Sequence, residues 1–251
     1  MRVLICLLVL VLSTGCTTTV EKSTPDPKAD APSRAAVHTQ LALGYLQRNQ
    51  KKTALDEIEK ALQIEPGYSP ANYVMAMLQT ELNHREKAGE YYRKALESDP
   101  QNSVAAHDYG IFLCKEGKVD EALKYFKSAL NNPLYDRKTL TNLRAGECLM
   151  NMRTNRRDAE PYFRAALKAD PTLAPALYYM ADIAYARKDY LQARAYIERY
   201  FSRGPDTAAT LLLAVKIESH LNSKDAARQY AARLREKFAS SDEVKQLKIY
   251  Q

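Results

Sequence analysis

Residues 94–100 read KALESDP, and similar phrases occur at two other places in the chain. KALQIEP occupies residues 60–66 and AALKADP occupies residues 165–171. Each phrase ends on a proline that directly follows an acidic residue. Proline lacks the backbone amide hydrogen and disfavours helix in the residue before it, so each phrase predicts the end of a helix. The recurrence of this helix-end pattern at three places indicates an internal repeat.

The spacing of small residues gives the period of this repeat. One series of alanines advances in five steps, four of 34 and one of 37, at Ala54, Ala88, Ala122, Ala159, Ala193 and Ala227. A second series follows seven residues later, at Ala61, Ala95, Ala129 and Ala166. A period of about 34 residues is the signature of the tetratricopeptide repeat, a helix–turn–helix unit. We therefore expect six repeats, at about residues 35–68, 69–102, 103–138, 139–173, 174–207 and 208–241.

Each repeat is expected to hold two helices, which we name helix A and helix B. In helix A, apolar residues recur at helical spacing, as at Leu41, Tyr45 and Leu46. In helix B, one large residue lies between the two phased alanines, as at Ile58 and Phe126. Neither helix buries its apolar stripe alone, so neighbouring repeats must stack. The sequence thus predicts an all-α fold, a right-handed superhelix of antiparallel helix pairs with a concave face, and assigns these residues to its core.

The composition of the chain agrees with this fold class. Glycine is scarce at 8 of 251 residues, and no run of alternating apolar residues indicates a strand. The net charge is +7, with basic and acidic residues interspersed along the expected helices, as in KKTALDEIEK at residues 51–60. A nucleic-acid-binding protein more often concentrates its charge in one patch, so we do not expect nucleic acid as a partner.

The first sixteen residues, MRVLICLLVLVLSTGC, differ from the rest of the chain. An apolar run at residues 3–12 follows a single basic residue and leads through small residues to Cys16. The run is too short to span a bilayer, which needs about 20 apolar residues, and it is typical of a signal peptide. The tripeptide TGC resembles a bacterial lipobox, in which the cysteine is lipidated, although Ser13 stands where leucine is usual. We expect lipidation of Cys16, with an ordinary cleaved signal peptide as the alternative.

Residues 17–33 (TTTVEKSTPDPKADAPS) hold three prolines and almost no bulky apolar side chain. This composition cannot form a packed core and predicts a disordered tether that reaches about 20–25 Å. Thr17 is not the aspartate that favours inner-membrane retention in enteric-type lipoproteins, so by that resemblance the anchor is expected in the outer membrane. The expected domains are a signal peptide at 1–15, the lipidated cysteine and tether at 16–33, and a solenoid at 34–251 that faces the periplasm.

Sequence signs of catalysis are missing from the chain. Its four histidines are far apart in sequence, without a second histidine or cysteine at metal-ligand spacing: His38, His84, His107 and His220. No glycine-rich phosphate loop, GxSxG elbow or HExxH motif occurs. We therefore expect no enzyme activity, cofactor, metal or small-molecule substrate.

The concave face of the superhelix is the expected partner site. In tetratricopeptide repeats, positions 2, 5, 9 and 12 of each copy generally face this side. These positions include Leu43, Leu46, Tyr73, Met77, His107, Ile111, Tyr178, Asp182 and Tyr185. The lysine and asparagine that grip the C-terminal carboxylate of chaperones do not occur at positions 5 and 9 of repeats one to three and five. The groove is thus expected to be apolar and aromatic and to hold an extended or helical segment of a partner, although some of these side chains could instead pack helix A against helix A.

Two cysteines remain in the expected solenoid, Cys114 and Cys148. They are one repeat period apart and occupy similar heights on the first helices of repeats three and four. An exported protein meets an oxidising compartment, which favours a disulfide between them. The bridge requires Cα atoms within about 7 Å, and two buried thiols are the alternative.

Three stretches resemble a known family: LALGYLQRN at 41–49, YGIFLCKEGKVDEAL at 109–123 and NNPLYDRKTLTNLRAGECL at 131–149. They look like the type IV pilus biogenesis and stability lipoproteins of the PilW/PilF type, and the resemblance covers Cys16 to about Ser240. It implies an outer-membrane lipoprotein of six tetratricopeptide repeats that acts as a pilotin or stabiliser for the ring-forming secretin. The expected partners are therefore the pilus secretin and possible further pilus proteins. A lipoprotein adaptor for peptidoglycan enzymes and a scaffold for outer-membrane protein assembly are the alternatives.

Overall fold

The computed structural model of the protein describes residues 32–151 and 156–249. The chain separates into two units, Met1–Ser33 and Arg34–Gln251, and every helix described below belongs to the second unit. The expected signal peptide at 1–15, Cys16 and nearly all of the expected tether lie outside the described residues.

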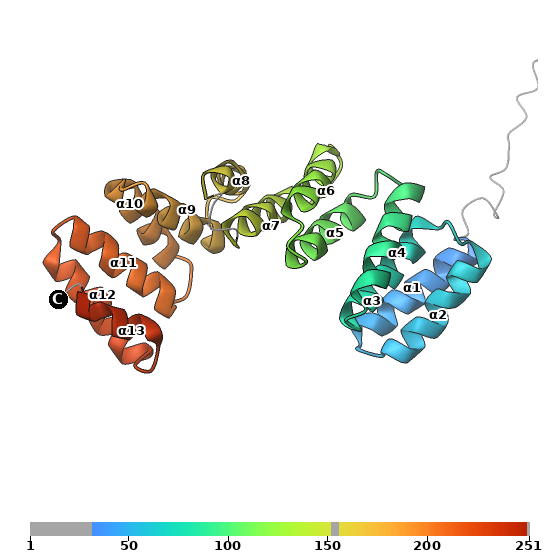
Figure 1. The fold of residues 1–251 in the computed structure, drawn as a ribbon, viewed down its shortest axis with the longest axis horizontal. Coiled ribbons are helices and arrows are strands. Elements are labelled where there is room, and N and C mark those ends of the chain that lie inside the picture. Colours follow the sequence, from blue (N-terminus) through green and yellow to red (C-terminus); the bar gives the residue numbers. More distant parts are fainter. Residues whose placement is uncertain (1–31, 152–155, 250–251) are drawn as a thin grey trace, which may run out of the picture. The chain divides into compact units, whose positions relative to one another are not determined.

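The described part of the chain consists of helices in consecutive pairs (Figure 1). The pairs, numbered here as repeats one to six, are α1 Arg34–Gln47 and α2 Lys51–Ile64; α3 Ser69–Glu81 and α4 Arg85–Ser98; α5 Ser103–Lys115 and α6 Val119–Asn131; α7 Lys138–Asn151 and α8 Arg156–Ala169; α9 Ala174–Ala186 and α10 Tyr190–Phe201; α11 Ala208–His220 and α12 Lys224–Lys237. A short helix, α13 Asp242–Gln246, and a 3-10 turn, η1 Leu247–Ile249, follow the last pair. These ranges contain no strand, and the prediction of an all-α tetratricopeptide-repeat fold is confirmed.

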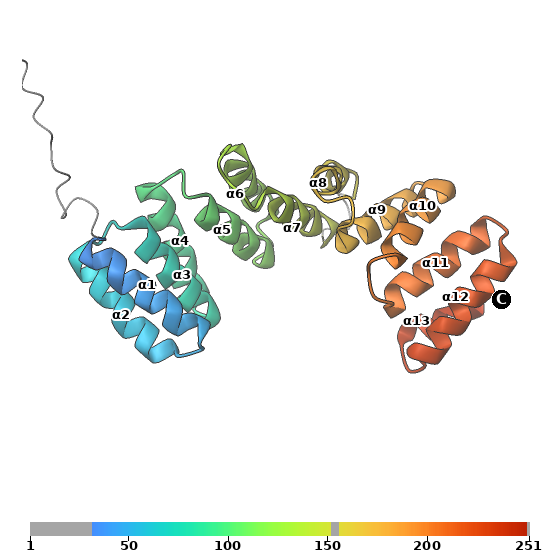
Figure 2. The same cartoon turned by 180° about the vertical axis from the view of Figure 1, so that it is seen from behind.

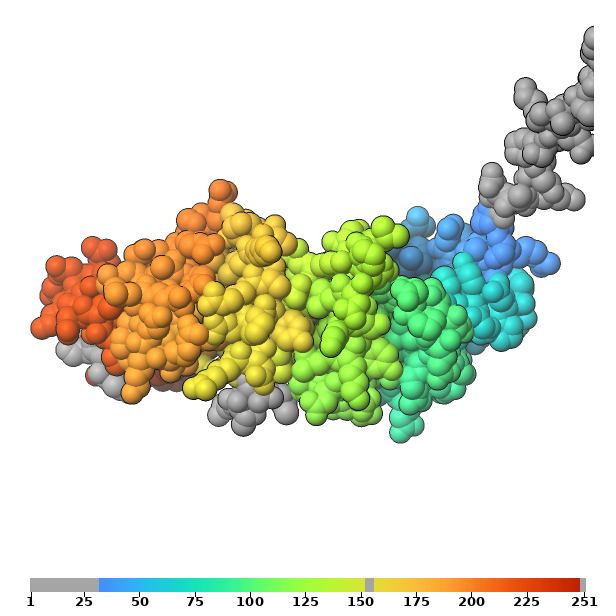
Figure 3. All heavy atoms as spheres, turned by 90° about the horizontal axis from the view of Figure 1, so that it is seen from above, coloured from blue at the N-terminus to red at the C-terminus, as the bar shows by residue number. Residues whose placement is uncertain are grey.

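Each repeat packs first within itself and then against the next one. The two helices of every pair contact each other, and helix B also contacts helix A of the following pair. Helices A of neighbouring repeats touch as well, as α1 touches α3 and α5 touches α7. The opposite view shows the same succession of pairs (Figure 2), and the space-filling view shows them as bands of successive colour along residues 34–151 and 156–249 (Figure 3).

The phased small residues form the contact between the two helices of a pair. Ala54, Ala88, Ala122, Ala159 and Ala193 are 0–1% exposed, and so are their counterparts seven residues later in the first four repeats. The large residue between the two alanines is also buried, from Ile58 in repeat one to Ile197 in repeat five. Small side chains allow two helices to approach closely, and the large residue fills the remaining space at the density of a protein interior. This packing explains the period that is visible in the sequence.

The longer step between Ala122 and Ala159, of 37 rather than 34, arises partly at the joint between repeats three and four. The glycine that faces the large ring of helix B advances by 36 residues, from Gly110 to Gly146. Two of the three extra residues therefore lie between these glycines, in the stretch that includes the six-residue connection 132–137 between α6 and α7.

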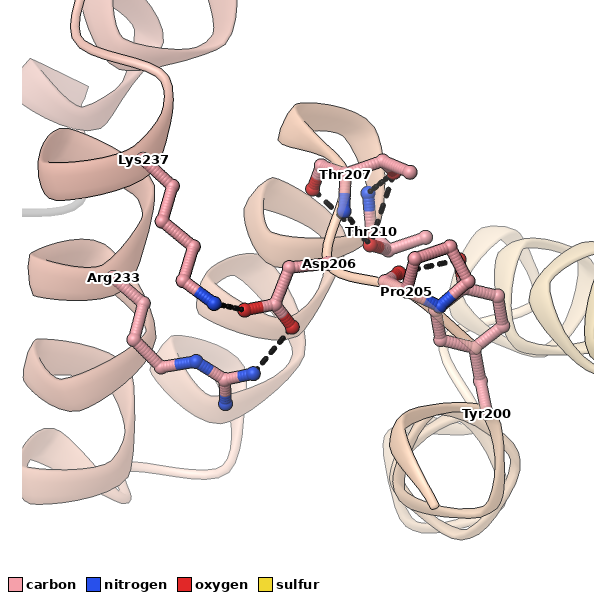
Figure 4. A network of polar contacts seen from close by, with 7 residues as sticks. All are labelled: Tyr200, Pro205, Asp206, Thr207, Thr210, Arg233 and Lys237. Atoms are coloured by element: carbon pink, nitrogen blue, oxygen red, sulfur yellow. Dashed lines mark hydrogen bonds and ion pairs between the residues drawn. The ribbon is translucent and has the colours of Figure 1, made fainter. Parts of the chain in front are cut away.

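The joint between repeats five and six is held by polar contacts (Figure 4). Asp206, just before α11, pairs with Arg233 and with Lys237 of α12, the latter at 2.7 Å between Nζ and Oδ2. Burial opposes ionisation of Asp206, but these two cations outweigh it and lower the pKa of the carboxyl group. Thr207 and Thr210 form a capping box at the start of α11, which satisfies amide groups that the helix leaves free.

The C-terminal helix α13 was not anticipated from the sequence. It contacts α11 and α12, and Leu247 of η1 is 2% exposed in a cluster with Leu211 and Leu234. Ser241 caps the helix, because its hydroxyl accepts a hydrogen bond from the backbone amide of Val244. The last full repeat is thus partly covered by a segment of the chain itself.

Candidate functional site: a groove on the first helices of the repeats

The expected partner residues lie on α1, α3, α5 and α9, which are helices A of four different repeats. Seven of them keep part of their side chain accessible: Leu43, Tyr73, Met77, Ile111, Tyr178, Asp182 and Tyr185. Most of these side chains also pack on the core clusters of the repeats, so a partner would meet a surface that is already held in place.

Two of the expected groove residues are buried instead, and that part of the prediction is wrong. Leu46 is 4% exposed and belongs to the core cluster of repeats one and two. His107 is 2% exposed, with its ring near those of Phe126 and Tyr135. Both side chains pack between helices. The prediction failed because the position within a repeat fixes the direction of a side chain but not how far a neighbouring helix covers it. Neither residue is available to a partner.

Tyr73 and Asp108 connect repeats two and three on this face. The hydroxyl of Tyr73, on α3, donates a hydrogen bond to Oδ2 of Asp108, on α5. Burial, followed by the nearby carboxylate, raises the pKa of Tyr73 well above its ordinary value. The tyrosine thus stays neutral, and its ring is oriented by a polar contact as well as by packing against Tyr92, at 6.4 Å between ring centroids.

A buried polar chain continues from this contact to the joint between repeats three and four. Nε2 of His107 lies 3.8 Å from Oδ1 of Asp108, and its Nδ1 lies 2.7 Å from Oγ1 of Thr141 on α7. Oγ1 of Thr141 is in turn 3.3 Å from the hydroxyl of Tyr135, in the six-residue connection. Burial lowers the pKa of His107 and outweighs the opposing effect of Asp108. The neutral histidine therefore links α5 to α7, and its neighbour Asp108 links α5 to α3.

The disulfide lies on the same face, in a depression of about 370 Å³ between α5 and α7. Cys114 and Cys148 are bonded, with their Cα atoms 5.8 Å apart. Ile111 lines this depression, and so do Arg144 and Glu147, which pair at 2.7 Å. The bridge fixes the spacing of two helices A on the face that a partner would contact.

A second depression, of about 230 Å³, lies over repeats five and six and brings together Tyr178, Asp182 and Tyr185. Burial, with a smaller contribution from Asp182, raises the pKa of Tyr178 to about 12. Asp182 accepts a hydrogen bond from Arg156 of α8, at 2.9 Å. The short helix α13 closes one side of this depression with Glu243 and Gln246.

Charged lining residues are the part of the site that sequence reasoning missed. Repeats four and six contributed no residue to the prediction, yet Arg144, Glu147 and Lys216 line the two depressions. The lining of repeats three to six is therefore mixed rather than only apolar and aromatic. The repeat period could have placed residues of repeats four and six on this face, but it does not reveal which charges pair.

The described residues include no arrangement of three or more His, Cys, Asp or Glu side chains that could hold a metal ion. No described helix combines the length and the hydropathy that a bilayer crossing requires. Neighbouring helices A contact each other and form one surface, as in repeat proteins that bind extended segments.

Comparison with known proteins places this surface in a family. Sequence models described as tetratricopeptide repeat match residues 69–102, 91–124 and 153–206. The type IV pilus assembly protein PilF of Pseudomonas aeruginosa is 29% identical over 234 residues, which cover 93% of this chain and 92% of that protein.

Solved structures agree with the sequence match. The structure of Pseudomonas aeruginosa PilF superposes with a TM-score of 0.77 at 28% identity, covering 87% of this chain and 98% of that one. PilW, described as a widely conserved type IV pilus biogenesis factor, superposes with a TM-score of 0.71 at 31% identity, covering 86% of this chain and 99% of that one. Since both proteins are matched over nearly their whole length, the chain belongs to the PilF/PilW family of tetratricopeptide-repeat proteins.

Proposed function

We propose that this protein is a membrane-anchored scaffold of type IV pilus biogenesis whose helix A groove holds a segment of the pilus secretin. The observation that carries the proposal is the match to PilF and PilW over 98% and 99% of their solved chains and over 87% and 86% of this chain. A surface built from stacked tetratricopeptide repeats suits a role in protein binding.

The groove part of the proposal rests on partly exposed apolar side chains in the first three repeats. Leu43, Tyr73, Met77 and Ile111 come from successive helices A and pack on the core beneath them. Because their supports are rigid, a partner segment would lose little of its binding free energy to reordering this surface. Other pilus proteins are further candidates for the same groove.

The anchor part of the proposal concerns the residues before the solenoid. We expect a signal peptide at residues 1–15, a lipid on Cys16, a tether up to residue 33, and a location at the periplasmic face of the outer membrane. Anchoring would raise the effective concentration of the groove near a secretin in the same membrane. The variant Cys16→Ala should appear in the soluble periplasm or as an unprocessed precursor. If it still fractionates with the outer membrane, Cys16 does not carry the anchor.

The groove is tested by placing charges on its apolar lining. In the double variant Leu43→Glu and Met77→Glu, a partner segment would bury two unpaired carboxylates, which is costly. SDS-resistant secretin multimers, measured by immunoblot, and surface pili, counted by electron microscopy, should both decline. The protein level and the helical circular dichroism should stay near those of the wild type.

A matched control changes two leucines that lie elsewhere. Leu134 is 91% exposed in the connection between α6 and α7, and Leu191 is 68% exposed on α10. Leu134→Glu with Leu191→Glu adds the same charge and should leave multimers and pili normal. If the folded groove variant also supports normal multimers and pili, the partner site lies on another face.

A further inference from the structure

The excess of positive charge lies in the second half of the chain. Residues 138–251 contain 20 basic and 13 acidic residues, whereas residues 1–137 contain 17 of each. The whole excess of +7 therefore falls in repeats four to six and the segment after them. A local excess of this kind attracts acidic partners, which corrects the expectation of an evenly spread charge.

Part of this charge surrounds a depression of about 460 Å³ beside α12 of repeat six. Its apolar lining comes from Val215, Ala227, Ala231 and Leu247. Its cationic rim comes from α12, where Lys224, Arg228 and Arg235 also line the depression. These three cations are spaced by four and seven residues, so they share one face of the helix.

The same face of the preceding helix B is covered by the next repeat. One repeat period before Lys224, Arg228 and Arg235 are Tyr190, Arg194 and Phe201 of α10. Tyr190 stacks on His220 of α11 at 4.4 Å, Arg194 pairs with Glu218 of α11, and Phe201 stacks on Tyr230 of α12 at 5.3 Å. The cationic rim of repeat six therefore occupies the positions that bind the following repeat elsewhere in the stack.

Arginines of helices B meet carboxylates of the next helix A in this half of the protein. Arg156 of α8 pairs with Asp182 of α9, and Arg194 of α10 pairs with Glu218 of α11. Arg228 holds the position of Arg194 one repeat later, but its described partner is Asp225 of its own helix. Both side chains of that pair are at least 77% exposed, and such surface pairs contribute little and exchange readily.

The short helix α13 covers only part of this face. Its first residue, Asp242, comes one repeat period after Ala208, the first residue of α11. It contacts both α11 and α12, as a helix A contacts the two helices of the repeat before it. Its continuation η1 ends at Ile249, which corresponds to Val215 in the middle of α11. The depression lies beside this segment, because Leu247 of η1 is one of its lining residues.

We propose that this depression binds an acidic amphipathic helix of a partner protein, lying along the cationic face of α12. Apolar side chains of that helix would enter the depression above Ala227 and Ala231, which are 8% and 9% exposed, and its carboxylates would meet Arg228 and Arg235. A concave lining that mixes apolar and polar side chains favours a side-chain-bearing segment over a flat membrane surface. The depression shares no lining residue with the two depressions of the groove, and it does not depend on the proposed role in pilus assembly.

A synthetic helix tests the proposal directly. The probe is a fluorescein-labelled peptide of about four turns, with leucines along one face and glutamates elsewhere. Fluorescence anisotropy with the full chain should show saturable binding that weakens as salt increases. Charge reversal by Arg228→Glu with Arg235→Glu should lower the affinity by about tenfold or more, because two complementary charges become repulsive.

The matched control is Arg157→Glu with Lys168→Glu, which changes two exposed cations of α8 by the same total charge. It should bind the peptide like the wild type, and circular dichroism should show both variants folded. An equal loss of peptide affinity in the control variant would show that the rim is not a specific site. Equal binding of a peptide with lysine in place of glutamate would show that acidic side chains are not recognised. Binding to phosphatidylglycerol vesicles without peptide binding, or self-association in sedimentation that the rim variant abolishes, would likewise overturn the proposal.

Discussion

The ring of Phe126 lies so close to Gly110 that no side chain fits between them. A Cβ atom on Gly110 would be 2.7 Å from Cε1 of Phe126, closer than such contacts occur in proteins. The next repeat has the same arrangement, since a Cβ on Gly146 would be 2.6 Å from the ring of Phe163. Glycine inside a helix destabilises it by about 0.5–1 kcal/mol relative to alanine. Here the missing Cβ leaves room for a large ring between the two helices of the pair.

Gly110→Ala is therefore expected to destabilise the protein, although alanine favours helix. Overpacking of a dense core costs about 1–3 kcal/mol, and this outweighs the gain in helix propensity. Gly44→Ala is the matched control, because no atom would lie within 4 Å of the new Cβ. It should leave the free energy of unfolding unchanged or raise it by up to about 1 kcal/mol. Urea denaturation followed by circular dichroism separates the two, and equal effects would contradict the packing explanation.

The disulfide between Cys114 and Cys148 should stabilise the joint between repeats three and four. Closing a loop of 34 residues restricts the unfolded chain, and reduction should lower the free energy of unfolding by about 2–4 kcal/mol. Titration of the denatured protein should find two more reactive thiols after reduction than before. The variant Cys114→Ala with Cys148→Ala should not respond to reductant. If reduction releases no additional thiol, the two cysteines are not bridged.

The repeat architecture could be predicted because its physical cause is local. Each small residue that lets two helices approach recurs at a fixed interval, and Ala54, Ala88 and Ala122 show that interval without any knowledge of the fold. The position within a repeat also gives the direction of a side chain. It does not show whether a neighbouring helix covers that side chain. For this reason the repeat positions of Leu46 and His107 predict groove residues, although both are buried.

Features that depend on long-range packing were harder to see. Cys114 faces Cys148, although the repeat counterpart of Cys114 is two residues further on, because the connection at 132–137 is two residues longer than those at 65–68 and 99–102. Two features at the C-terminal end of the solenoid do follow the sequence. The start of α13 lies one repeat period after that of α11, and the charge excess appears when the two halves of the chain are counted separately.

The buried His107 should make stability depend on pH. Its pKa in the folded protein is lowered from 6.5, so below about pH 6.5 the unfolded chain takes up a proton that the folded chain does not. Stability should therefore fall as the pH drops from 6.5 toward the lowered pKa, by at most about 1.4 kcal/mol per pH unit. The charges near the ring belong to Asp108, Arg137 and Arg144.

Urea denaturation at pH 7.5 and pH 5.5 measures this effect. His107→Gln should reduce the difference in stability between the two pH values, whatever its effect at pH 7.5. His84→Gln, at an exposed histidine, should retain the difference seen in the wild type. A wild-type difference that survives His107→Gln in full would assign the pH dependence to other groups.

Arg194 and Glu218 should couple repeats five and six more strongly than any exposed pair. Nε of Arg194 is 2.9 Å from Oε1 of Glu218, and the glutamate is 3% exposed. Arg194→Ala would leave this carboxylate buried without its partner, at a cost of about 3 kcal/mol or more. Arg228→Ala, one repeat later, removes only an exposed pair and should cost about 0–1 kcal/mol. The double variant Arg194→Leu with Glu218→Leu should lose much less free energy of unfolding than the single variant Arg194→Ala, because it leaves no buried charge. Equal losses for Arg194→Ala and Arg228→Ala in urea denaturation would contradict a coupling role for the buried pair.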